Sequence, residues 1–163
     1  MRIGHGYDAH RFCTGKPLVI GGVTMDVPYG LEAHSDGDVL IHALMDALLG
    51  AAGERDIGTQ FPDTSDTYKG IDSRLLLKKT MEIISADGLE LTYADMTVVA
   101  QKPKLKPYIE SMRATIAETA GVPVERINVK ATTEEHMGFT GREEGIAAHA
   151  VCLLDEKRAS DSE

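Results

Sequence analysis

Three side chains near the start of the chain have the types and spacing of a metal-ligand set. Asp8 and His10 are two residues apart, so on a β-strand both side chains point to the same side. His42 interrupts a long apolar run. Two histidines and an aspartate leave the fourth position of a zinc ion open for a substrate oxygen, and the same set suits non-haem iron. The alternative is that Asp8 and His10 are exposed polar residues at a strand end.

The segment that carries His42 reads as one helix from about residue 36 to residue 53. Ser35 followed by Asp38 resembles a capping box, and apolar residues surround nearly the whole helix, which is typical of a buried one. Three polar residues four apart share one face: Asp38, His42 and Asp46. This face is either the solvent-exposed edge of the helix or part of a metal or phosphate site. The second interpretation is favoured because His34 and Ser35 lie at the expected helix N-terminus, where free N–H groups attract anions.

The segments before this helix read as β-structure. Residues 1–10 alternate as a strand, with Ile3, His5 and Tyr7 on one face and Asp8 and His10 on the other. Residues 17–28 read as a hairpin that turns at two consecutive glycines.

A long polar loop over 56–73 follows the helix, and loops of this length are usually functional or mobile. Its candidate ligand contacts are Asp56 and Asp63, which read equally well as ordinary solvated acids. Ser73 is then the expected cap of a second helix over 74–86. The later elements alternate, with strands over 89–100, 126–132 and 146–154, a lysine-bearing loop over 101–107, and a helix over 107–120.

Length and composition restrict the class of protein. The 163 residues suit one domain, and a net charge of −9 argues against general nucleic-acid binding. The two cysteines are too few for a disulfide framework, and no run is apolar and long enough for a membrane helix. We expect an α+β fold: a mainly mixed sheet with helices packed on one face and a small N-terminal hairpin. We expect residues 1–155 to form a single catalytic domain and residues 156–163 to form a charged flexible tail.

Several motifs in order resemble one family. These motifs are HGYDAH, AHSDGDVLIHALMDALLGA, ERDIG, FPDT, AQKPKL and VKATTEEHMGFTGREEGIA, and together they resemble the 2-C-methyl-D-erythritol 2,4-cyclodiphosphate synthases of the non-mevalonate isoprenoid pathway. The resemblance implies a homotrimer with active sites between subunits. Because the N-terminus has no apolar signal core, we expect a cytoplasmic protein, or a plastid one after loss of a transit peptide. It also implies that the 2-phosphate of a cytidine diphosphate substrate attacks the β-phosphate and releases CMP.

The resemblance also implies residue roles. Asp8, His10 and His42 are the expected zinc ligands, and Glu135 is the expected ligand of a second ion, Mg²⁺ or Mn²⁺. His34 and Thr133 are the expected catalytic residues. The expected substrate contacts are Asp8, His10, His34, Ser35, Asp56, Ile57, Gly58, Phe61, Pro62, Asp63, Thr64, Ser65, Ala100, Gln101, Lys102, Pro103, Lys104, Leu105, Lys106, Ala131, Thr132, Thr133, Glu134, Glu135, Phe139 and Arg142.

Some questions stay open at this point. Asp38 and Asp46 lie on the same helix face as His42, so either could orient its ring, and Asp46, four residues further on, is favoured. Glu134 and Lys106 depart from the family pattern. A zinc-dependent phosphohydrolase and a non-catalytic trimer that binds zinc or an isoprenoid are the competing functions.

Overall fold

The computed structural model describes residues 1–157, so the predicted tail lies outside the described residues from residue 158 onward. Its main feature is a five-stranded sheet in the order β4-β1-β7-β5-β6. Strands β5 and β6 are parallel, and the other neighbouring pairs are antiparallel. The strands are β1 (Arg2–Cys13), β4 (Gly30–Leu31), β5 (Leu89–Val99), β6 (Ile127–Thr132) and β7 (Gly145–Glu156).

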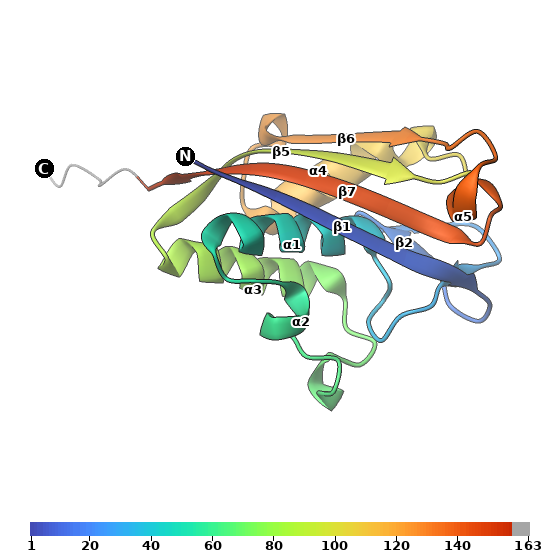
Figure 1. Cartoon of the computed structure of the whole chain (residues 1–163), viewed down its shortest axis with the longest axis horizontal. Coiled ribbons are helices and arrows are strands. Elements are labelled where there is room, and N and C mark those ends of the chain that lie inside the picture. The colour runs from blue at the N-terminus through green and yellow to red at the C-terminus, as the bar shows by residue number, and fades with distance from the viewer. Residues whose placement is uncertain (158–163) are drawn as a thin grey trace, which may run out of the picture.

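The three long helices lie on one face of this sheet, with α1 directly against it (Figure 1). They are α1 (Val39–Ala52), α3 (Ser73–Ala86) and α4 (Ile109–Ala120). The expectation of a mixed sheet with helices on one face is therefore confirmed. Short helical turns complete the fold: α2 (Ile57–Gln60), α5 (Gly138–Gly141), η1 (Asp66–Tyr68), η2 (Lys106–Tyr108) and η3 (Val124–Arg126).

The predicted N-terminal hairpin is also present. Strands β2 (Leu18–Ile20) and β3 (Val23–Met25) pair antiparallel around Gly21 and Gly22, which both have positive φ. Glycine adopts this conformation without strain, which explains the two consecutive glycines. Among residues 1–157, none of the helices has the length and apolar character needed to cross a bilayer.

Helix α1 and strand β1 approach each other closely because two glycines of the strand have no side chain. A Cβ atom at Gly6 would lie 1.8 Å from the carbonyl oxygen of Ala43, and one at Gly4 would lie 1.9 Å from that of Ala47. The alternation of β1 places these glycines on the helix side, together with Asp8 and His10. The approach therefore brings the backbone of α1 next to the strand that carries two of the predicted metal ligands.

The helix starts differ from the predicted ones. Helix α1 begins at Val39, and Asp38 is its N-cap, because its carboxylate accepts a hydrogen bond from the Ile41 N–H at 3.0 Å. The predicted capping box starting at Ser35 is wrong. Helix α3 is likewise capped by Asp72, whose carboxylate accepts from the backbone N–H of Arg74, rather than by Ser73. In both cases a carboxylate, rather than the predicted hydroxyl, is the acceptor at the helix start.

The other face of the sheet is open to solvent and partly apolar. Tyr7 and Ile3 of β1 are 46% and 71% exposed, in agreement with the predicted alternation of this strand. The register of β1, β7 and β5 places Val151 and Tyr93 on the same face, and both are exposed. Isolated apolar side chains on a surface are common, but here they share one sheet face.

The contact between α1 and β1 predicts a sharp difference between two glycine substitutions. Gly6→Ala should lower the free energy of unfolding by about 3 kcal/mol or more, because its methyl group overlaps a helix backbone that cannot move without displacing the core. Gly50→Ala is the control: Gly50 is exposed within α1, its Cβ would meet no atom within 4 Å, and alanine should stabilise the helix by about 1 kcal/mol. Chemical denaturation measures both, and equal effects would contradict the close contact.

Candidate metal centre

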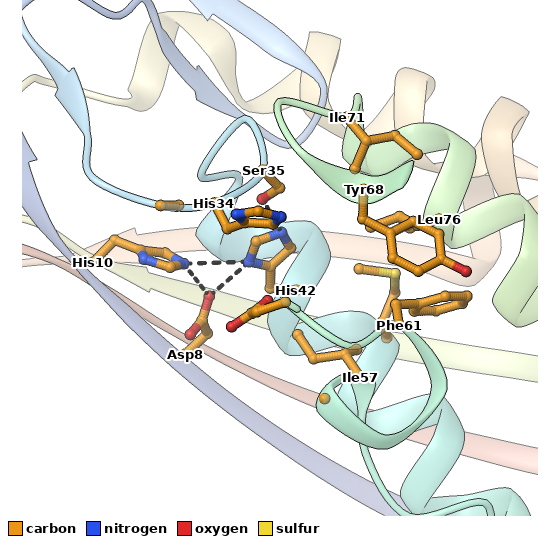
Figure 2. A pocket seen from close by; sticks show the side chains of 14 residues that line it. Asp8, His10, His34, Ser35, His42, Ile57, Phe61, Tyr68, Ile71 and Leu76 are labelled. Carbon is orange, nitrogen blue, oxygen red and sulfur yellow. Dashed lines mark hydrogen bonds and ion pairs between the residues drawn. The ribbon is translucent and has the colours of Figure 1, made fainter. Parts of the chain in front are cut away.

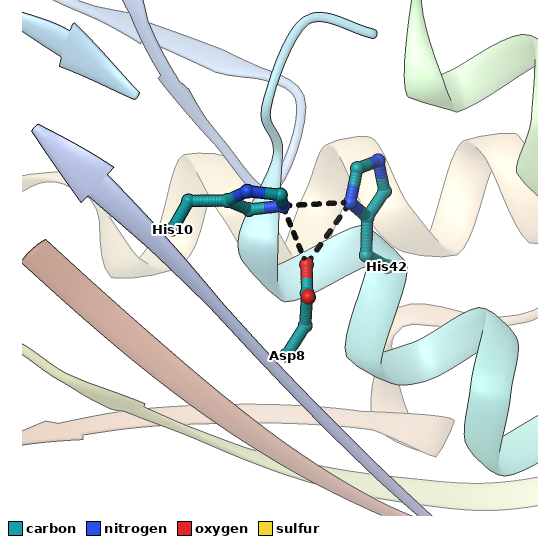
Figure 3. A group of neighbouring side chains, drawn as sticks. All are labelled: Asp8, His10 and His42. Carbon is teal, nitrogen blue, oxygen red and sulfur yellow. Dashed lines mark hydrogen bonds and ion pairs between the residues drawn. The ribbon is translucent and has the colours of Figure 1, made fainter. Parts of the chain in front are cut away.

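The three side chains predicted as metal ligands meet at one point, as Figure 3 shows. The Oδ2 atom of Asp8 lies 2.8 Å from Nε2 of His10 and 3.0 Å from Nδ1 of His42. The two ring nitrogens are 3.3 Å apart. Strand β1 supplies the first two residues through its period of two, and the buried helix α1 supplies the third. The prediction that the three residues come together is confirmed, and the group could hold a metal ion.

The charge of Asp8 dominates the electrostatics of this group. Burial alone would raise the pKa of the Asp8 carboxyl, but hydrogen bonds and charge interactions with His10 and His42 lower it to about 2. Burial likewise works to lower the pKa of His42, but Asp8 overcomes this effect and the pKa is raised. The centre therefore presents a permanent negative charge that favours a positive charge, either a proton or a metal ion, between the three side chains.

His42 is held from its other ring nitrogen by two hydroxyl groups. Its Nε2 lies 2.9 Å from Oγ of Ser73 and 3.1 Å from Oγ of Ser35. The ring is only 6% exposed, so the interpretation of this helix face as a solvent-exposed edge is wrong. Because Nε2 faces the hydroxyls, Nδ1 is the atom presented to Asp8 and His10.

Neither carboxylate that was considered as the partner of His42 has that role. Asp46 accepts a hydrogen bond from the backbone N–H of Ile57 at 2.8 Å, which connects α1 to the start of α2. The favoured prediction that Asp46 orients the ring is therefore wrong. Asp38 is bound elsewhere as well, and its own carboxylate occupies the N-terminus of α1. His34 and Ser35 thus lie in the loop before the helix, not at free N–H groups of its first turn.

Asp38 instead fastens the hairpin to helix α1. Its carboxylate accepts hydrogen bonds from the N–H groups of Gly21 at 2.9 Å and Gly22 at 2.7 Å, in addition to that of Ile41. The side chain has no exposed surface. Burial is the main reason that its pKa is raised to about 6, and the nearby charge of Asp36 adds to the effect, while the three N–H groups oppose it.

A cavity of about 200 Å³ opens next to the metal-ligand group (Figure 2). The three ligands, His34, Ser35 and Asp63 supply its polar groups, and apolar side chains from α1, α2, α3 and the connecting loops form the rest. Eight of the predicted substrate contacts line the cavity, together with residues that the sequence did not indicate. The lining residues are Asp8, His10, Ala33, His34, Ser35, His42, Met45, Ile57, Gly58, Phe61, Asp63, Tyr68, Ile71 and Leu76.

The other predicted contacts lie outside this cavity. Within the described part of the chain, none of residues 100–106 or 131–135 lines it. Asp56 is at the rim, where it caps α2 by accepting hydrogen bonds from the N–H and hydroxyl groups of Thr59. Phe139 lines a separate shallow pocket beside β1, and Arg142 pairs with Glu144 at 2.9 Å. One chain thus carries two separate groups of predicted contacts.

The second group is itself a connected unit. Lys102 pairs with Glu143 at 3.1 Å and lies over the rings of Phe12 and Tyr29. The side-chain oxygen of Gln101 accepts a hydrogen bond from the backbone N–H of His136, so the 101–106 and 133–144 segments lie side by side. Glu134 is exposed, and its carboxylate accepts a hydrogen bond from the hydroxyl of Thr140.

Sequence reasoning missed four residues of the site that matter: Ser73, Asp36, Tyr68 and Leu76. Ser73 follows Asp72 at a helix start, so in the sequence it reads only as an ordinary capping residue. In the structure it contacts His42, which lies 31 positions away. No local pattern in the sequence indicates such a contact.

The buried carboxylate of Asp38 predicts a specific pH dependence. Its folded-state pKa of about 6 exceeds the ordinary 3.8, so the folded state binds the proton more tightly and stability falls as pH rises between these values. The free energy of unfolding of the wild type, relative to Asp38→Asn, should decrease by about 2.5 kcal/mol from pH 4 to pH 7. Denaturant titrations at several pH values measure this difference. Parallel curves for the two proteins would contradict it.

Comparisons with known proteins agree with this geometry. A family model described as the YgbB family matches residues 1–155. A Pseudomonas putida (strain W619) protein named 2-C-methyl-D-erythritol 2,4-cyclodiphosphate synthase is 60% identical over 154 residues, which cover 94% of this chain and 98% of that protein. A Pseudomonas aeruginosa (strain UCBPP-PA14) protein of the same name is 59% identical with the same coverage.

Solved structures agree as well. A CDP complex of IspF from Plasmodium falciparum is 31% identical with a TM-score of 0.84, over 96% of this chain and 97% of that one. The bifunctional IspDF from Campylobacter jejuni is 46% identical with a TM-score of 0.92, over 95% of this chain, which spans 42% of that longer protein. Family model, relatives and structures agree over nearly the whole chain, and the chain belongs to the YgbB family.

Proposed function

We propose that this chain is a 2-C-methyl-D-erythritol 2,4-cyclodiphosphate synthase of isoprenoid biosynthesis. It converts 4-diphosphocytidyl-2-C-methyl-D-erythritol 2-phosphate to the cyclic diphosphate and CMP. The observation that carries the proposal is the meeting of Asp8, His10 and His42 at the edge of a cavity, in a chain 60% identical to a protein with this name.

The donor set fits a zinc ion. One carboxylate oxygen and two imidazole nitrogens lie within 4.8 Å of one another, and the ring of His42 presents Nδ1 to the other two ligands. Three protein ligands leave one position open for a phosphate oxygen. A bound zinc ion would supply charge neutralisation for the phosphates and hold them in place.

The residues of the chain then bind and align the substrate. In the reaction, an oxygen of the 2-phosphate forms a bond to the β-phosphorus, and the bond from the β-phosphorus to the oxygen of the α-phosphate breaks. CMP leaves with that oxygen and its electron pair. The attacking phosphate is already an anion, so no residue needs to remove a proton, and alignment carries most of the catalysis. His34, Ser35 and Thr133 are the residues that we assign to the phosphates.

The cavity suits the methylerythritol part of the substrate. Phe61, Leu76 and Ile57 offer apolar surface to its carbon skeleton, and Asp63 can accept hydrogen bonds from its hydroxyl groups. Asp56 at the rim has a second carboxylate oxygen that its contacts with Thr59 leave free, because both of those hydrogen bonds go to Oδ1.

We assign the cytidine and diphosphate parts to the second group of residues, 100–106 and 131–135. Lys104 is exposed and can pair with phosphate, and the backbone groups of this loop can bind the edge of the base. Glu135 is exposed and can hold a second divalent ion, Mg²⁺ or Mn²⁺, together with phosphate oxygens and water. The CDP complexes among the related structures support a cytidine nucleotide as ligand.

The separation of the two groups supports a homotrimer in which neighbouring subunits complete each site. A single chain does not bring residues 100–106 to its own cavity, within the range described. The open sheet face provides an apolar surface, with Ile3, Tyr7, Tyr93 and Val151 exposed in one chain. Association through that face would bury it.

Phosphorus NMR of the purified protein with this substrate, zinc and magnesium tests the proposed reaction. The expected result is a cyclic diphosphate together with CMP, in equal amounts. Linear products containing oxygen from labelled water would instead indicate a phosphohydrolase. A folded, zinc-loaded protein that leaves the substrate intact would also overturn the proposal and would favour a binding protein.

The assignment of the cavity to the methylerythritol part predicts the effect of Asp63→Ala. Loss of a hydrogen bond to a carboxylate costs about 1.5–3 kcal/mol, so kcat/KM should fall by about tenfold or more. Zinc content should not change, because Asp63 is not one of the three ligands. Asp66→Ala is the matched control, since Asp66 is an exposed acid of the same loop that does not line the cavity. Equal effects of the two substitutions on steady-state kinetics would refute the assignment.

A further inference from the structure

We infer that Asp36 and Ser73 form a hydrogen-bond relay that accepts the Nε2–H group of His42 and so fixes the ring orientation with Nδ1 toward the metal position, and that this relay sets the metal affinity of the centre. The inference rests on the proposed metal site and goes beyond it. It assigns a positioning role to two residues that contact neither the metal position nor the cavity, within the residues described.

The relay begins at the carboxylate of Asp36, which holds Ser73 with both oxygens. Oδ1 accepts a hydrogen bond from the Ser73 hydroxyl at 2.5 Å, and Oδ2 accepts one from the Ser73 backbone N–H at 2.9 Å. The carboxylate is itself fixed, because Oδ1 also accepts from the backbone N–H of Asp38 at 3.1 Å. Ser73 is completely buried, so its hydroxyl does not contact bulk water.

The hydrogen bonds determine where the protons lie. An ionised carboxylate only accepts, so the single proton of the Ser73 hydroxyl is directed to Asp36. The Ser73 oxygen is then left as an acceptor toward Nε2 of His42, 2.9 Å away. Nε2 must therefore carry a hydrogen. Nδ1 faces the Asp8 carboxylate at 3.0 Å and can donate a second hydrogen to it; a metal ion would take the place of that hydrogen and bind the lone pair of Nδ1, while Nε2 keeps its hydrogen toward Ser73.

Ser35 does not duplicate this role. Its Oγ also lies 3.1 Å from Nε2 and accepts from the backbone N–H of Gly37, but no carboxylate directs its proton. If Ser35 is a second acceptor of the same Nε2–H hydrogen bond, the hydrogen of its own hydroxyl stays available to a ligand in the cavity that it lines. The direction of the relay therefore comes from Asp36.

The relay also holds the ring mechanically. Asp36 belongs to the loop before α1, Ser73 begins α3, and His42 lies on α1, so three segments are joined at the nitrogen opposite the metal position. Ligand rings in metalloproteins are commonly fixed by such a partner, and its loss typically weakens metal affinity by about 10- to 100-fold.

The test compares Asp36→Asn and Ser73→Ala with a matched control, Asp72→Asn. Asp72 is the neighbouring carboxylate at the start of α3, but it binds the N–H and side chain of Arg74 and does not contact Ser73. Zinc affinity is measured by competition with a chromophoric chelator. The hydrogen bond of the His42 Nε2–H group is measured in the zinc-loaded protein, from the ¹⁵N and ¹H chemical shifts of the ring and from the rate at which this hydrogen exchanges with solvent. His42→Ala identifies the signals and gives the affinity without this ligand.

The zinc-loaded wild type and Asp72→Asn should show a slowly exchanging Nε2–H group and the same zinc affinity. Asp36→Asn and Ser73→Ala should speed the exchange of this hydrogen and weaken zinc binding by about 10- to 100-fold, with the metal-free proteins still folded. An unchanged exchange rate or unchanged affinity in both variants would overturn the relay.

Failure of the relay is distinguishable from failure of the proposed function. A wild type that binds zinc and shows the expected variant effects, but forms no cyclic product, overturns the reaction and supports the relay. A wild type that binds no zinc overturns the metal centre and with it the role of the relay. A wild type that forms product while both variants keep normal zinc affinity overturns the relay alone.

Discussion

The close packing of helix α1 on strand β1 is the constraint on which the site depends. Carbonyl oxygens of the helix occupy the space above Gly4 and Gly6, where any other residue would place a side chain. This contact allows His42 of the helix to reach Asp8 of the strand at hydrogen-bond distance. A wider spacing, as is usual between a helix and a sheet, would separate the ligand atoms and leave no common position for a metal ion.

In the short loop before α1, the carboxylates of Asp36 and Asp38 bind different parts of the fold. Asp38 is fully buried and fastens the hairpin through three backbone N–H groups, at the cost of a raised pKa. Asp36 is only partly buried and holds the start of α3 through Ser73. Two carboxylates two residues apart thus connect α1 to different parts of the fold, and neither is one of the metal ligands. Asp8 is therefore the one carboxylate within the ligand group.

Much of the fold was predictable from the sequence because it follows from local periodicity. The alternation in β1 gave the shared side of Asp8 and His10, and the apolar circumference of α1 gave its burial. The partner of His42 was not predictable in this way. Helical spacing favoured Asp46, whereas the structure brings in Ser73, whose position depends on how α3 packs against α1. Likewise, the choice between neighbouring hydroxyl and carboxylate residues as the helix cap depends on backbone angles. The residue types alone do not reveal those angles.

The bond from Asp46 to the backbone of Ile57 has a consequence for how the cavity can open. The segment that forms one wall of the cavity is anchored at this end, and at its other end by the bond from the Gly70 N–H to the His34 carbonyl oxygen at 2.7 Å. Between these anchors, the wall can exchange with open conformations by local unfolding of a few exposed turns. The ligand group is built on β1 and α1, outside that cooperative unit. The wall can therefore unfold locally to admit a ligand while the three metal-ligand side chains keep their arrangement.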